Sequence, residues 1–358
     1  GNIGIRHVRS DQTSTALINV NGDLEKGAQE ICDEVGECLS SYAYQDLGAK
    51  YDYNLPSLNL NYSLAENDQL RLALARVLSR PPINRLAASD TDGTVSLVGD
   101  EAYFNYGGDT ATSPFLTPFI ADQIDISYEH YMPETNGSFV IAGYHREIKS
   151  FIQDITYENY DFRANGFDVP DTYAYIQNGV DIETEVLNGD YKTVINNMDG
   201  GFIRGLEISY TQTFNFLPEL WSGLGISTSY SLTDSEISVV NPVESLSGGT
   251  LPFPGLVEKS ANFTVFYSYG GFETRLSTTF QDSFVGETRN VNLQPIVYAP
   301  ETLLDYQAAY KFDNGLDIVF SVSNLTNEPN RSYMFDEELT RTLQWFGRTY
   351  YVGANYTF

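Results

Sequence analysis

The feature that most constrains the fold is a period-two alternation of apolar and polar residues that recurs from one end of the chain to the other. In the segment SLNLNYSL, Leu58, Leu60, Tyr62 and Leu64 would share one face of a strand, and the serines and asparagines between them would share the other. Helical periodicity is nowhere sustained. The alternation therefore predicts an all-β protein built from antiparallel strands.

The alternating segments are numerous and long. We expect twelve strands, commonly longer than the five or six residues usual in soluble sheets. Their approximate ranges are 2–18, 48–64, 68–80, 120–132, 138–163, 201–216, 223–237, 258–269, 271–285, 301–312, 315–327 and 343–358. No stretch of the chain approaches the ~18 uninterrupted apolar residues of a membrane-spanning helix.

The connections between these segments alternate between short and long. Asn136-Gly137, Gly270-Gly271 and Asn314-Gly315 supply tight-turn residues in three of the short ones,. The connections after the first, third and fifth strands run to roughly thirty residues or more. A sheet with short connections at one end and long connections at the other is typical of outer-membrane β-barrels. A Greek-key sandwich would instead have short and long loops at both ends.

In such a barrel the two faces of each strand have different solvents. About 9–11 tilted residues cross a bilayer, so the apolar face would meet lipid and the polar face a wet lumen. Tyr62, Tyr131, Tyr230 and Tyr267 fit the aromatic girdles at the membrane interfaces,. We expect a lumen-facing wall network, able to hold a plug, from Arg71, Asp125, Glu129, Glu207, Arg275 and Asp305.

The chain ends in YYVGANYTF, an alternating segment with an aromatic last residue. A terminal aromatic gains nothing where a soluble chain frays. In a barrel, however, lipid would bury Phe358 and the last strand would close against a neighbour. We predict a lipid-facing terminal signal made of Tyr350, Val352, Tyr356 and Phe358.

Composition excludes several functions. The net charge of −28 argues against a nucleic-acid partner, because phosphates demand Lys and Arg,. Three scattered histidines share no ligand spacing, and Asp90 and Asp92 in SDTDGT lack the other ligands of a calcium loop,. Gly-x-Ser-x-Gly is absent. We therefore expect no metal, no cofactor and no enzymatic activity.

Cys32 and Cys38 are the only cysteines and have five residues between them. Two unrelated thiols in a loop remain one interpretation. We predict instead a short disulfide, because no histidine lies nearby to complete a zinc site. A disulfide implies an oxidising compartment, and strand parity places this first long connection outside the cell.

The C-terminal segment resembles the last hairpin of TonB-dependent outer-membrane receptors. Asn324 to Asn327 match the end of their penultimate strand, and Gly347, Arg348, Tyr350 and Gly353 match the pattern of their last strand. LNLNYSLAENDQLRLALARVLSRPP and GGFIRGLEISYTQTFNFLPELWSGLGISTSYSLTDSEI are similar to mid-barrel hairpins of the branch found in Caulobacter- and Xanthomonas-like bacteria, many of which import carbohydrates. GGDTATSPFLTPFIADQIDIS departs from the family's G-N-P-x-L-x-P pattern.

The resemblance implies a bacterial outer-membrane barrel of about 22 strands. Residues 1–358 would be its C-terminal portion, a single domain truncated at the N-terminus, with the plug and the TonB-engaging segment upstream. It also implies active import of a scarce nutrient, energised through the plug by the TonB–ExbB–ExbD complex. The other implied partners are outer-membrane lipid, the outer-membrane assembly machinery and a small-molecule ligand.

The external loops are where we expect ligand recognition. Their aromatic residues are Tyr103, Phe104, Tyr106, Phe167, Tyr173, Tyr175, Trp345 and Phe346. Aromatic platforms beside Asp and Asn suit sugar rings, so a carbohydrate or oligosaccharide is the first expectation. The same aromatics could instead fold the loops upon themselves.

Other functions remain open. The substrate could be a ferric siderophore or another TonB-dependent ligand, although the acidic surplus mildly disfavours anionic ligands. The chain could also be a self-contained twelve-stranded barrel, such as an autotransporter translocator or a lipase, because twelve is an even count that can close. In that case the first and last strands would pair. A soluble all-β binding module is the remaining alternative.

Overall fold

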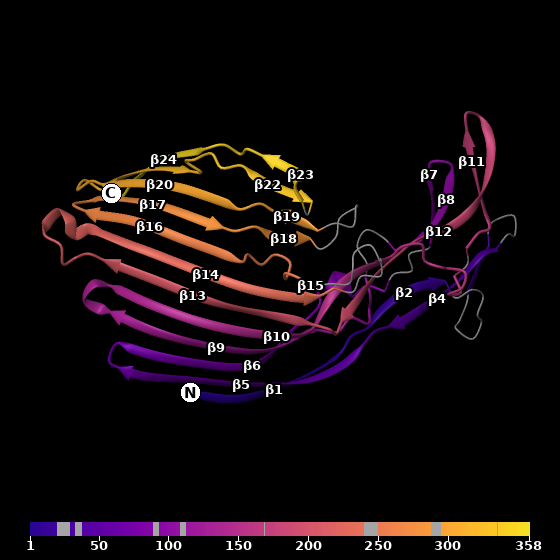
Figure 1. Cartoon of the computed structure of the whole chain (residues 1–358), viewed down its shortest axis with the longest axis horizontal. Coiled ribbons are helices and arrows are strands. Elements are labelled where there is room, and N and C mark those ends of the chain that lie inside the picture. Colours follow the sequence, from indigo (N-terminus) through magenta and orange to yellow (C-terminus); the bar gives the residue numbers. More distant parts are fainter. Residues whose placement is uncertain are drawn as a thin grey trace.

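The computed structural model describes residues 1–19, 29–32, 38–88, 93–107, 112–167, 169–239, 250–287, 295–334 and 336–358. Twelve long antiparallel strands form one curved sheet, which we call the wall (Figure 1). They are β1 (Asn2–Asp11), β5 (Lys50–Ala65), β6 (Asp68–Ser79), β9 (Phe119–Met132), β10 (Gly137–Tyr157), β13 (Gly201–Thr213), β14 (Leu224–Ser238), β16 (Lys259–Tyr269), β17 (Phe272–Gln281), β20 (Glu301–Lys311), β21 (Leu316–Ser323) and β24 (Thr349–Tyr356). The all-β antiparallel fold and the twelve strands are confirmed.

Each wall strand pairs with the next wall strand along the chain, from β1–β5 to β21–β24. β1 and β24 lie at opposite edges of the sheet (Figure 1). Among the described strands no pairing joins β1 to β24. A closed twelve-stranded barrel requires that pairing, so this structure does not support the self-contained barrel.

The short connections adopt the tight turns that their residues predict. Asn136 follows the 3-10 turn η3 (Pro133–Thr135) in the left-handed region, with φ 47°. Gly315 has φ 87°, and a Cβ there would lie 2.2 Å from the carbonyl oxygen of Thr357. Only glycine fits that position. These turns gather at one end of the wall, and the long connections gather at the other (Figure 1).

Four predicted strand boundaries are wrong. The first predicted strand, 2–18, breaks after Asp11 into β1 and β2 (Ser14–Asn19). The fifth ends at Tyr157, six residues early, and the eleventh ends at Ser323, where Asn324 takes φ 54°. The last begins at Thr349, because 336–344 form a separate strand.

The long connections contain strands that the pattern did not predict. They are β3 (Gln29–Cys32), β4 (Cys38–Leu47), β7 (Thr94–Val98), β8 (Glu101–Tyr106), β11 (Thr172–Gln177), β12 (Val180–Asn197), β15 (Thr250–Leu251), β18 (Phe284–Glu287), β19 (Ile296–Tyr298), β22 (Asn330–Met334) and β23 (Asp336–Gln344). The described residues also include the 3-10 turns η2 (Ile83–Arg85) and η4 (Glu219–Gly223). In the described part of the chain, no helix has the length and apolarity to cross a membrane.

The register separates the wall into two faces, because directly opposite residues of an antiparallel pair point to the same side. Leu60 lies opposite Leu72, which lies opposite Ile126, and Leu206 lies opposite Leu232. Leu60, Ile126 and Leu206 remain 41–50% exposed. This apolar side, which we call the outward face, is the one predicted to meet lipid.

Beyond the wall, β7, β8, β11, β12 and the connection 158–167 form an external lobe (Figure 1). β8 pairs with β12 in parallel, and Phe104, Phe162 and Val186 form part of its core. Phe162 is completely buried. The lobe therefore has a hydrophobic core of its own.

Candidate functional site

The polar face of the wall, which we call the inward face, carries a charged patch on β6, β9, β10 and β13. The Arg71 guanidinium lies 3.0 Å from the Glu129 carboxylate. Arg71, Asp125 and Glu207 line one depression of about 690 Å³, together with Arg146 and Tyr144. Sequence analysis identified the first three of these and Glu129, but missed Arg146 and Tyr144, which a parity count along β10 could have found.

The other two predicted wall residues lie elsewhere on the same face. Arg275 lines a smaller depression with Glu273 and Gln307. Asp305 accepts a hydrogen bond from the backbone N–H of Asn324 at 2.8 Å, and so holds the end of β21. The six predicted residues thus form one cluster of four and two separate positions, rather than a single network.

Most of the predicted external aromatics pack into the lobe. Phe104 is 5% exposed and its ring lies 5.0 Å from that of Phe162. The Tyr106 and Phe167 rings are also 5.0 Å apart, and both contact the lobe core. Tyr173 packs against the same core and stacks on Tyr175 at 6.5 Å. The alternative interpretation, that these aromatics fold the loops, describes them better than a ligand platform does.

Three aromatics are less enclosed. Trp345 and Phe346 are 59% and 76% exposed, just before Gly347, whose φ is 81°. The Tyr103 hydroxyl donates to the Glu101 carboxylate at 2.6 Å. That hydrogen bond to a neighbouring carboxylate raises the pKa of Tyr103 above its usual range,. Trp345 and Phe346 are the predicted ligand residues that remain free to meet a ligand.

Three of the four tyrosines predicted for the girdle lie on the outward face, as that prediction requires. Tyr62, Tyr230 and Tyr267 share the outward face with the leucines. Tyr131 instead lies on the inward face and donates to Glu129. Val352 and Tyr350 lie on the outward face of β24, opposite Phe320 and Val322, and Tyr356 lies opposite Leu316. Phe358 follows β24, and its ring lies 6.0 Å from that of Tyr356.

The predicted disulfide falls in a sheet made of β2, β4 and β3. The backbone register places Cys32 directly opposite Cys38. Opposite residues of an antiparallel pair have Cα atoms about 4.5–5.5 Å apart, which suits a disulfide. The side chains of both cysteines lie outside the described residues, so the bond stays a prediction. Asp90 and Asp92 also lie outside them.

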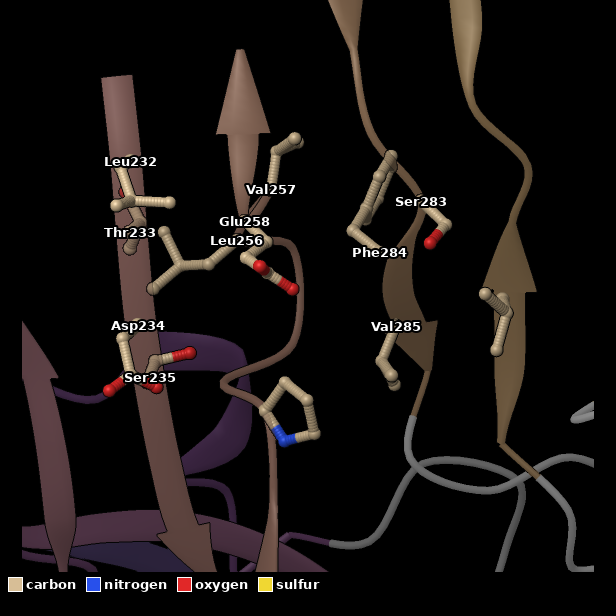
Figure 2. Close-up of a pocket in the computed structure, with 12 residues that line it drawn as sticks. Leu232, Thr233, Asp234, Ser235, Leu256, Val257, Glu258, Ser283, Phe284 and Val285 are labelled. Atoms are coloured by element: carbon tan, nitrogen blue, oxygen red, sulfur yellow. The ribbon is translucent and has the colours of Figure 1, made fainter. Parts of the chain in front are cut away.

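A cavity that the sequence pattern did not predict lies beside β14 (Figure 2). β16 stops pairing with β14 at Leu232–Lys259, and β15 takes over at Ile237–Leu251. This cavity, of about 520 Å³, lies between them, lined by β14, the 252–258 connection and β18. Its two carboxylates, Asp234 and Glu258, are already ion-paired with basic side chains. We therefore assign no ligand to it.

Within the described residues, no group of three His, Cys, Asp or Glu side chains could hold a metal ion.

A second structural feature that the sequence pattern did not predict is the segment 112–118. The Asn196 amide accepts from the N–H of Thr117 and donates to its carbonyl, each at 2.8 Å. Leu116 is 2% exposed. Residues 112–118, in the described part of the segment that departs from the family pattern, are therefore held in place.

Comparison with known families identifies the wall. The family model described as "TonB dependent receptor-like, beta-barrel" matches residues 1–325. The chain belongs to this family. Its members are outer-membrane proteins, so the predicted fold and location of this receptor chain are confirmed. No curated protein matches the chain in sequence.

Solved structures share the fold of this receptor chain at low identity. The ferric-catecholate import receptor Fiu from K12 E. coli is 16% identical, with a TM-score of 0.59 over 100% of this chain and 42% of Fiu. The copper transporter OprC is 12% identical, with a TM-score of 0.54 over 99% of this chain and 45% of OprC. The siderophore receptor PiuA from Acinetobacter baumannii is 12% identical, with a TM-score of 0.52 over 89% of this chain and 37% of PiuA. The chain thus spans less than half the length of the receptors it resembles.

Proposed function

We propose that this chain is the C-terminal portion of the barrel of a TonB-dependent importer. The observation that carries the proposal is the open, two-faced wall of a chain that belongs to the TonB-dependent receptor family. The two free edges, β1 and β24, would pair with further strands of the same protein. A barrel of about 22 strands holds a plug in its lumen, and the inward charged patch on β6, β9, β10 and β13 suits such a plug.

Import would proceed without chemistry on the ligand. The TonB–ExbB–ExbD complex would supply energy by acting on the plug. The outward-facing Tyr350 and Val352 of β24 would serve the outer-membrane assembly machinery as a terminal signal. No cofactor is part of this proposal.

For the substrate, an iron or other metal chelate is better supported than a carbohydrate. The carbohydrate expectation depended on aromatic platforms, and Phe104, Tyr106 and Phe167 are engaged in the lobe. The receptors of similar fold are described as siderophore, ferric-catecholate and copper proteins. Trp345 and Phe346 would contact the ligand from the connection before β24.

The test uses cells that produce the full-length receptor, supplied with iron-55 as a ferric catecholate chelate or with a radiolabelled maltooligosaccharide. We expect energy-dependent uptake of the chelate that disappears when TonB is deleted. A Trp345→Ala, Phe346→Ala double variant should lower its affinity about thirtyfold, since each aromatic contact contributes ~1 kcal/mol. TonB-dependent uptake of the sugar alone would overturn the substrate class. TonB-independent uptake of both would overturn the function.

A further inference from the structure

An ion pair lies on the outward face of β6 and β9, directly beyond the apolar residues. Arg76 and Asp122 are directly opposite each other in the register. The Nε and Nη2 atoms of Arg76 donate to the two carboxylate oxygens of Asp122, at 2.7 and 2.8 Å. Leu74 and Ile124 lie two residues from this pair on the same face, toward the short turns. Beyond the pair, Leu78 lies opposite Ile120 on the same face, but Ile120 is only 7% exposed. The charge therefore begins where the exposed apolar surface of these two strands ends.

Beyond β10, where Glu147 lies opposite Asp122, the arrangement recurs one register row nearer the short turns. Arg204 of β13 lies opposite Asp234 of β14, with Nη2 at 2.7 Å from Oδ2. Tracing the register through His145 shows that this pair occupies the row of Leu74 and Ile124. Immediately below it, Leu206 and Leu232 resume the apolar surface.

The third repeat lies one more row toward the short turns. Lys259 of β16 lies opposite Leu232, in the row of Leu206. Its ammonium is 3.7 Å from Asp282, which follows β17, and 3.1 Å from Glu258. Below it, Ala261 faces Phe280.

These steps have a geometric cause. Strands of a barrel tilt by about 35–45° to its axis, so a register row runs obliquely around the barrel. Ion pairs that shift by one register row toward the short turns at successive strand pairs therefore stay near one position along the barrel axis. Arg76, Asp122, Arg204, Asp234, Lys259 and Asp282 form such a level band, which we call the ionic belt. It follows the edge of the apolar surface that faces the long connections.

The acidic partners leave donors unused. A guanidinium has five N–H groups, and Asp122 and Asp234 each take two from their arginine. The side chains of Arg76, Arg204 and Lys259 are 42%, 60% and 44% exposed. Arg204 also lies over the Phe202 ring, 5.0 Å from its centre. The carboxylates and this ring hold the cations in place while the remaining N–H groups stay accessible.

We propose that the ionic belt binds the phosphate groups of lipid headgroups in the leaflet at the long-connection end of the wall. Phosphate oxygens accept from guanidinium and ammonium groups. The belt is continuous with the apolar surface, so the phosphate it meets is that of a lipid rather than a free anion. This interaction fixes the height of the barrel in the membrane and does not depend on the imported substrate.

The test compares two lipids that differ by one phosphate. The full-length receptor is placed in phosphatidylcholine nanodiscs containing either phosphatidic acid or diacylglycerol, and retained lipid is measured by native mass spectrometry after detergent extraction. One basic side chain near an anionic surface gains ~1 kcal/mol, which corresponds to about fivefold in binding. The variant Arg76→Gln, Arg204→Gln, Lys259→Gln should lose at least tenfold of the phosphatidic acid and none of the diacylglycerol.

Arg71→Gln is the matched control, because Arg71 pairs with Glu129 in the same way on the inward face. It should retain phosphatidic acid like the unchanged receptor. Asp122→Asn with Asp234→Asn removes only the acidic partners and should raise phosphatidic acid retention, which a folding defect would not do. Equal retention by the triple variant and the unchanged receptor would overturn the proposal. So would an equal loss in Arg71→Gln.

Discussion

In the wall, the apolar residues Leu60, Ile126 and Leu206 are 41–50% exposed, whereas in the external lobe Ala102, Phe162 and Val186 are at most 1% exposed. Both regions are antiparallel or mixed β structure from the same chain. The wall places its apolar side chains outward for lipid to cover, and the lobe encloses them among its own strands. Apolar residues of the same types are therefore covered by lipid in the wall and by protein in the lobe.

The difference should appear most strongly when one aromatic side chain is removed from each region. Phe162→Ala deletes a fully buried ring and should cost the lobe about 3–5 kcal/mol,. Hydrogen exchange should then rise in β8 and β12 and stay unchanged in β13 and β14. Phe263→Ala is the matched change on the outward face, where Phe263 is 44% exposed. Lipid fills the space left there, so protection should barely change. Unaltered exchange in β8 and β12 would contradict a separate lobe core.

A charge placed on each face of one wall strand sharpens the comparison. Ile208 and Ser209 are neighbours in β13 and lie on the outward and inward faces. Ile208→Arg should destabilise the folded receptor in lipid vesicles by about 2–4 kcal/mol, because an arginine on the lipid face is costly near the membrane centre. Ser209→Arg should cost little, since its charge meets water. Urea titration monitored by heat-modifiable migration measures both. Equal costs would mean that the faces are not distinct.

These effects also explain how much of the molecule could be predicted from its sequence. The wall strands were predicted because lipid and water impose opposite requirements on alternate residues, as with Leu58, Leu60 and Tyr62. The lobe strands were missed because β8 carries aromatic residues on both faces. Tyr103 lies on one face and Phe104 and Tyr106 on the other, which hides any alternation of apolar and polar residues.

The candidate site was predicted unevenly for the same reason. Arg71, Asp125 and Glu207 could be placed on the inward face by counting along regular strands. Tyr106 and Phe167 could not be told from ligand-binding aromatics, because they pack against each other and against Tyr191, which lie in three separate parts of the chain. Tyr131 was misplaced because its position at a strand end suggested a girdle, while parity puts it beside Glu129.

The smallest expected effect is a titration confined to the lobe. The Glu101 carboxylate raises the pKa of Tyr103 in the folded protein, so the protonated phenol is the form that folding favours. This contribution is complete below the unfolded pKa of about 10 and is lost as pH rises through the higher folded value. Ultraviolet absorbance should show one fewer late-ionising tyrosine in Tyr103→Phe than in the unchanged protein, and earlier ionisation of one tyrosine in Glu101→Gln. No change in Glu101→Gln would contradict this pairing.

The central claim, that one wall face meets lipid and the other meets water, is tested most directly by a spin-label scan along residues 204–212 of β13. The full-length receptor, with Cys32 and Cys38 replaced by serine, carries one label at a time in lipid vesicles. Accessibility to oxygen should peak at Leu206, Ile208 and Tyr210, and accessibility to a water-soluble nickel complex at Glu207, Ser209 and Thr211. A two-residue period with these phases is the predicted result. Absence of that period, or reversed phases, would contradict the account.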